Sequence, residues 1–186
     1  MKIIKILFFY IVFISLNSCN ESNAVKNKKE QFETNNFDYS LYNSEKFKFI
    51  ISDDSSDNFN SETNILSRKY RDSTVNIKIE LTPKENETIF KLCKELNVRS
   101  FPKEIRNLSD YSILPSFNLY LKFCFVDNCN EVELNDELLD KKILSLNPQH
   151  IKEDSNKFLI IYNKIWKIIG SKNDFKNLPE SDLMYM

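Results

Sequence analysis

The sequence predicts an α+β fold, in which an antiparallel β-sheet carries two main helices packed on one face. Two segments, 75–81 and 117–125, alternate between apolar and polar residues, as half-buried strands do. Two other segments, 82–97 and 155–169, repeat apolar residues every three or four positions, which is typical of amphipathic helices. Each of these elements is apolar on one side only. A sheet covered by helices on one face buries the apolar sides of both the strands and the helices.

The first part of the predicted domain consists of strands joined by turns. Phe47–Ser52 and Ile65–Tyr70 predict two strands, and the acidic, serine-rich run Asp53–Asp57 between them predicts a solvated loop. An EF-hand calcium loop would need a glycine within such a run, and none is present. Arg71–Ser73 predicts a turn before the alternating strand 75–81.

The first helix has strong start signals. Thr82 is a suitable cap, Pro83 suits the first helical position, and Glu85 completes a capping box with Thr82. The helix is expected to end near Asn97, and an irregular connection then runs from 101 to 115. Cys93 lies on the apolar stripe of this helix, so we expect a buried, unreactive thiol.

The segments 117–125 and 131–134 predict a β-hairpin with a turn at 126–128. Cys124 and Cys129 flank this turn and fall opposite each other. Opposed residues of a non-hydrogen-bonded pair come within disulfide range, so a Cys124–Cys129 disulfide is expected. Two free thiols, or a metal-binding or redox role, are the alternatives.

The second main helix is expected over 155–169, with Asp154 or Ser155 as its cap. Gly170, the only glycine in the chain, follows its last apolar residue. Many helices end in a residue with positive φ, and glycine takes that conformation without strain. We therefore expect Gly170 to end the helix with a positive φ.

The composition excludes several classes of function. One glycine allows no glycine-rich phosphate-binding loop, so nucleotide binding is not expected. A net charge of −1 disfavours binding to nucleic acid. A single histidine, His150, cannot build a multi-histidine zinc site, and its place in the predicted turn 147–150 favours a solvent-exposed loop residue over a catalytic one. We expect no catalytic residue to be identifiable, and neither a metal nor a cofactor.

The N-terminus has the pattern of a secretion signal. Lys2 and Lys5 precede and interrupt the apolar stretch Ile3–Ile14, which is too short to span a membrane. The following residues Leu16-Asn17-Ser18-Cys19 resemble the lipobox of bacterial lipoproteins, from which Asn17 departs. The resemblance implies cleavage before Cys19 and a diacylglyceryl anchor on its sulfur, which would make the membrane a partner.

These features give a division of the chain into a lipoprotein signal peptide (1–18), a flexible tether rich in Asn, Ser, Glu and Lys (19–46) and a single α+β domain (47–186). Some later aromatic residues of the tether are candidates for docking on the domain, so the sequence does not fix the residue at which the tether ends and the domain begins. The chain as a whole resembles small uncharacterised lipoproteins of Bacteroidota. That resemblance implies lipid anchoring in the cell envelope, in the outer membrane, facing either the periplasm or the cell surface.

The same resemblance bears on one possible modification. Asp72-Ser73-Thr74 resembles the short O-glycosylation sequon of Bacteroidota, which would place a glycan on Ser73. A plain hairpin turn explains these three residues equally well.

The sequence leads to three hypotheses about function. The first is a non-enzymatic binding or protein-interaction domain held at the membrane. The second is an envelope hydrolase with a carboxylate- or Ser-based site, which would need a deep pocket with converging polar groups. The third is an inhibitor or immunity-type lipoprotein with one envelope protein as partner and an exposed apolar patch. Tyr111, Tyr120 and Trp166 are candidates for lining a groove, although aromatic residues at such spacing more often belong to the core.

Overall fold

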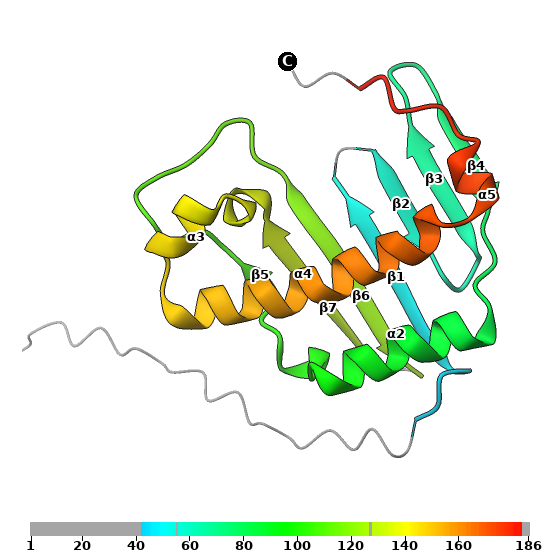
Figure 1. The fold of residues 1–186 in the computed structure, drawn as a ribbon, viewed down its shortest axis with the longest axis horizontal. Helices are drawn as coiled ribbons and strands as arrows, with labels where there is room; N and C mark the ends of the chain where they lie inside the picture. The colour runs from blue at the N-terminus through cyan, green and yellow to red at the C-terminus, as the bar shows by residue number, and fades with distance from the viewer. Residues whose placement is uncertain (1–41, 55, 127, 184–186) are drawn as a thin grey trace, which may run out of the picture. The chain divides into compact units, whose positions relative to one another are not determined.

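The alternating strands form a sheet with one apolar face. The computed structural model describes residues 42–54, 56–126 and 128–183, and in it seven strands form one sheet in the order β4-β3-β2-β1-β6-β7-β5 (Figure 1). The strands are β1 (Phe47–Asp53), β2 (Asp57–Asn60), β3 (Ile65–Lys69), β4 (Thr74–Lys78), β5 (Glu104–Ile105), β6 (Asn118–Phe125) and β7 (Asn128–Asn135). Neighbouring strands are antiparallel, except for the short parallel pair of β5 and β7.

Two long helices, α2 (Pro83–Glu95) and α4 (Gln149–Gly170), lie across one face of this sheet (Figure 1). Shorter helices are η2 (Val98–Ser100), η3 (Asp136–Leu139), α3 (Lys141–Leu146) and α5 (Asn173–Lys176). The arrangement confirms the predicted α+β class, a mainly antiparallel sheet with two main helices on one face. Among the described residues, no helix is both long enough and apolar enough to cross a membrane.

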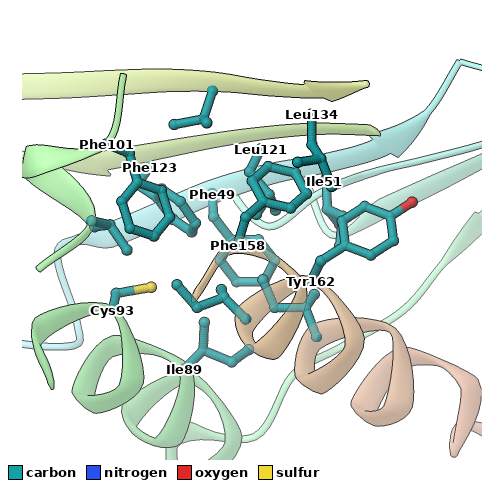
Figure 2. Packing of buried hydrophobic residues seen from close by; sticks show 14 of the residues in the cluster. Phe49, Ile51, Ile89, Cys93, Phe101, Leu121, Phe123, Leu134, Phe158 and Tyr162 are labelled. Atoms are coloured by element: carbon teal, nitrogen blue, oxygen red, sulfur yellow. The ribbon is translucent and has the colours of Figure 1, made fainter. Parts of the chain in front are cut away.

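The hydrophobic core lies between the sheet and the two long helices. Figure 2 shows strand residues facing helix residues across it, with Phe49, Ile51, Leu121, Phe123 and Leu134 on the strands, Ile89 and Cys93 on α2, and Phe158 and Tyr162 on α4. Phe47 packs within this core, with its ring centroid 5.2 Å from that of Phe125 and 5.6 Å from that of Phe90. Truncating a buried phenylalanine of this kind to alanine costs about 3–5 kcal/mol.

The opposite face of the sheet is polar. Strand side chains that point away from the core, such as Lys48, Ser52 and Lys122, are only half-buried. In the part of the chain that the structure describes, no helix covers this face (Figure 1).

The second main helix begins earlier than expected. Helix α4 starts at Gln149, directly after Pro148, so neither Asp154 nor Ser155 caps it. The prediction of these caps was wrong because Ile151 extends the apolar stripe toward the N-terminus. Ser155 lies on the same buried side, inside the helix, and is fully buried.

Gly170 also differs from its expected conformation. It is the last residue of α4, and no described glycine has a positive φ. The next residue, Ser171, is itself near the right-handed helical conformation, with φ of −77°. The chain thus leaves α4 through a right-handed turn that leads directly into α5, and this path needs no left-handed residue.

The domain begins before Phe47. The ring of Tyr42 packs edge-on against Phe125, with 6.1 Å between centroids. The carbonyl of Ser44 accepts a hydrogen bond from the side chain of Asn86 on α2. The packed domain therefore extends at least to Tyr42, into the segment 19–46 that the sequence predicts as a tether.

Candidate functional site

A buried polar network holds together three segments beside β5. Glu137 of η3 is only 8% exposed, and both of its carboxylate oxygens accept hydrogen bonds. Oε1 accepts from the backbone N–H of Ile113 at 2.6 Å, and Oε2 accepts from Nδ2 of Asn107 at 2.9 Å. A buried carboxylate thus fixes the connection between β5 and β6 onto η3.

Asn147, between α3 and α4, completes this network. It is 3% exposed, and its Oδ1 accepts from the backbone N–H of Leu108 at 2.7 Å. Its Nδ2 donates to Oδ1 of Asn107 and to the carbonyl of Ile143. Each polar side-chain atom of Glu137 and Asn147 therefore has a partner, which is the condition under which such a network makes a loop rigid.

The segments joined by this network present large apolar side chains to solvent. We call these six residues the apolar end surface: Leu108 (59% exposed), Tyr111 (60%), Ile113 (48%), Leu114 (83%), Leu139 (51%) and Leu146 (48%). They come from the β5–β6 connection, η3 and α3, which lie at the β5 end of the sheet (Figure 1). Single exposed apolar residues are ordinary, but several on adjoining segments make this end of the sheet a candidate interaction surface.

Apart from Tyr111, sequence reasoning does not single out the apolar end surface, because the stretch from 101 to 115 has the pattern of an irregular connection. A usable signal was present. Leu108, Tyr111, Ile113 and Leu114 are apolar, yet they follow neither the strand nor the helix period. Apolar residues in a loop without either period have no expected place in the core.

Cys124 and Cys129 are joined by a disulfide. They are paired opposite each other on β6 and β7, with 4.1 Å between their Cα atoms. Cys129 is exposed on the polar face of the sheet, and Cys124 is half-buried there. The bond therefore links the two strands beside their turn, on the side opposite the helices.

The acidic run is not a solvated loop throughout, and this part of the prediction was wrong. Asp57 begins β2, is 7% exposed and forms a buried ion pair with Arg68. Asp53 accepts hydrogen bonds from the backbone N–H groups of Ser56 and Asp57. These carboxylates serve as structural acceptors, and the described residues contain no group of three or more His, Cys, Asp or Glu side chains placed so that it could hold a metal ion.

Three other residues singled out in the sequence lie far from any common site. Ser73 is exposed in the turn between β3 and β4, where its carbonyl accepts from the N–H of Tyr70. His150 is exposed as expected, but it lies in the first turn of α4 and not in a loop. Cys93 is fully buried on α2, and this burial raises the pKa of its thiol well above 9.

The three aromatic residues considered for a groove are not brought together. Tyr111 belongs to the apolar end surface, Tyr120 is half-buried on the polar face of the sheet, and Trp166 packs against Phe175 and Tyr162. They line no common groove.

A hollow of about 340 Å³ beside β7 has a lining rich in carboxylates. Glu104, Glu131 and Glu133 line it. Glu104 forms an ion pair with Arg106, and Glu131 forms one with Lys122. Two of the three carboxylates are thus already engaged with cations.

Cys19, the expected lipidation site, lies outside the described residues. Comparison of the chain with protein-family models, with curated proteins and with solved structures found no match.

Proposed function

We propose that this chain is a lipid-anchored envelope protein whose domain binds a protein partner through the apolar end surface. The lipobox-like segment ending at Cys19 supports the anchor, and the exposed apolar side chains support the protein partner. This proposal joins the interaction-domain hypothesis with the expectation that an inhibitor-type protein exposes an apolar patch.

The observation that carries the proposal is the coupling of a buried polar network to an exposed apolar loop. Burying a carboxylate is costly unless it is well hydrogen-bonded. Here Glu137 is buried, and the groups that it binds belong to the loop that exposes Leu108, Ile113 and Leu114. The network holds these side chains in place before a partner arrives, which lowers the entropic cost of binding.

Site-specific photocrosslinking in intact cells tests the proposal. A photoreactive residue at position 114 should form an adduct with one protein, and the same residue at position 160 should not. Ile160 is a matched control, because it is an apolar residue of α4 with 51% exposure. Equal yields of the same adduct from both positions, or no specific adduct from 114, would count against this surface.

Substitutions then show whether the adduct depends on the apolar contact. Leu108→Ser should reduce the adduct formed from position 114, and Ile160→Ser should leave it unchanged. Unfolding curves of both variants check that the domain remains folded. An adduct that survives Leu108→Ser, Ile113→Ser and Leu139→Ser alike would overturn the assignment.

Glu137→Gln tests whether the network presents the loop. Glutamine keeps one acceptor oxygen but turns an NH₂ group toward a donor, a loss of about 1–3 kcal/mol at a buried site. We expect the Ile113 amide hydrogen to lose protection in hydrogen exchange and the crosslink from position 114 to weaken. Unchanged protection of Ile113 would mean that the loop does not depend on Glu137.

The anchor has its own test, independent of the binding surface. Cys19→Ser should leave the precursor unprocessed or release the protein from the membrane fraction. Normal processing and membrane retention of Cys19→Ser would refute the lipobox assignment without affecting the proposed interaction surface.

A further inference from the structure

The sheet has an open edge at β4. Hydrogen bonds from the N–H of Tyr70 to the carbonyl of Ser73, and from the N–H of Ile79 to the carbonyl of Asn64, flank the β3–β4 ladder. Because hydrogen-bonded pairs alternate along an antiparallel ladder, Val75 and Ile77 direct their backbone groups toward β3.

The remaining residues of β4, Thr74, Asn76 and Lys78, direct their N–H and C=O groups outward, away from β3. No described residue bonds these backbone groups. An unpaired row of this kind is a template for another strand.

The residues of β4 do little to prevent pairing. The strand Thr74–Lys78 contains no proline, and its single charge is at its end. Val75 is 37% exposed on the side of the helices, next to Ile77. The edge at β5 is different, because that strand has only two residues and lies between Lys103 and Arg106.

We propose that β4 pairs with β4 of a second copy of this chain, antiparallel and centred on Asn76. In this register Asn76 lies opposite Asn76 of the second copy, and each of Thr74, Asn76 and Lys78 both donates and accepts a backbone hydrogen bond. Only this register pairs all of β4, and the result is one continuous sheet through both copies.

The side chains favour a second copy in this register. Val75 of each copy lies opposite Ile77 of the other, which buries two apolar pairs on the helix side. Lys78 lies opposite Thr74 of the other copy and keeps the ion pair with Glu80 of its own chain, so no lysine opposes a lysine. A register centred on Lys78 would instead place two ammonium groups opposite each other.

The β4 pairing does not depend on the proposed function of the apolar end surface. Figure 1 shows α3 and β4 at opposite ends of the sheet. A dimer joined at β4 therefore carries its two apolar end surfaces at its outer ends, where both are free to bind partners.

Cysteine crosslinking of the full chain in its membrane tests the pairing. Asn76→Cys should form a disulfide-linked dimer on oxidation with copper phenanthroline, because opposed hydrogen-bonded residues lie about 5.5 Å apart at Cα. Asn58→Cys is the matched control. Asn58 is also an exposed asparagine, but it lies on the inner strand β2. It is paired with Ser67 of β3, and Ser67 is in turn paired with Asn76 of β4.

The crosslinking has two informative results. A dimer from Asn76→Cys and none from Asn58→Cys is the expected result. Equal crosslinking of both variants, or an adduct of Asn76→Cys with a different protein, would overturn the second-copy assignment.

Charge variants test the register without threatening the fold, because Thr74 is exposed. Thr74→Lys places a lysine opposite Lys78 of the other copy at both ends of the pair, and Thr74→Glu places a glutamate there. From two symmetric cross-strand pairs we expect roughly a two- to thirty-fold weakening and a comparable strengthening of dimerisation, respectively. Sedimentation equilibrium of the detergent-solubilised protein measures both. A monomer at all concentrations, or identical constants for the two variants, would refute the proposal.

Discussion

The guanidinium of Arg68 donates two parallel hydrogen bonds to the carboxylate of Asp57, at 2.8 Å from Nε and 2.6 Å from Nη2. The two residues lie opposite each other on β3 and β2, and each is 7% exposed. Nη1 of Arg68 also donates to the carbonyl of Pro179, and the guanidinium lies 4.8 Å from the ring centroid of Phe175. One buried cation thus connects two strands to α5 and the C-terminal segment.

Removing the anion from this pair should destabilise the domain strongly. Asp57→Asn leaves Arg68 charged and buried without its counter-ion, and breaking a buried pair in this way costs about 3–5 kcal/mol. Urea unfolding measures the loss, and Asp72→Asn, in an exposed turn, is the control with a change near zero. Equal unfolding midpoints for Asp57→Asn and Asp72→Asn would contradict the structural role of the pair.

The sequence predicted the elements whose local chemistry is complete within a few residues. The capping box of Thr82 and Glu85 is formed as expected, with Glu85 N–H donating to Thr82 and Thr82 N–H donating to Glu85. The hairpin of β6 and β7 follows from alternation and from the opposed cysteines. In these elements the residues that determine the structure are neighbours in the chain.

The features that sequence reasoning missed depend on residues far apart in the chain. Asp57 belongs to an acidic run and is buried only because Arg68 lies opposite it. The loop at Asn107 is held by Glu137 and Asn147, and no pattern in the sequence near Asn107 predicts these two partners. The apolar end surface depends on the same long-range contacts, so its residues could be noticed in the sequence but not placed.

Stability should depend on pH through Glu85. Burial raises the pKa of its carboxyl. Hydrogen bonds from Lys172 and Thr82, together with the charge of Lys172, lower this pKa by more than burial raises it, so the net pKa lies below the ordinary 4.5. A lowered pKa gives stability that is complete above pH 4.5 and is lost as pH falls through the folded-state pKa.

The excess stability of the wild type over Glu85→Gln should therefore shrink as pH falls below 4.5. Urea unfolding of both proteins at a series of pH values measures this difference. Glu95→Gln, at an exposed position of the same helix, should show no such trend. A Glu85→Gln difference that stays constant with pH would show that the ion pair with Lys172 does not contribute to stability.

Cys93 should react with thiol reagents only when the domain opens. The thiolate is the reactive form, and burial raises the pKa of this thiol well above 9. Peptide-resolved alkylation at pH 8 should leave Cys93 unmodified in the native protein and modify it fully in urea. A cysteine introduced at exposed position 58 is the positive control, and native labelling of Cys93 at a similar rate would mean that α2 is not closed over it.

Gly170→Ala distinguishes the conformation seen in the structure from the one that the sequence suggested. In the structure Gly170 is helical, and a Cβ added there would meet only the side chain of Phe175, at 3.9 Å. Alanine should then stabilise the domain by about 0.5–1 kcal/mol, because glycine loses more conformational freedom in a helix. Had the residue a positive φ, alanine would instead destabilise it by about 1 kcal/mol. The sign of the shift in the urea midpoint decides between the two. Lys167→Ala is the control, at an exposed position one turn earlier. Because lysine and alanine have similar helix propensities, this change should leave the urea midpoint nearly unchanged.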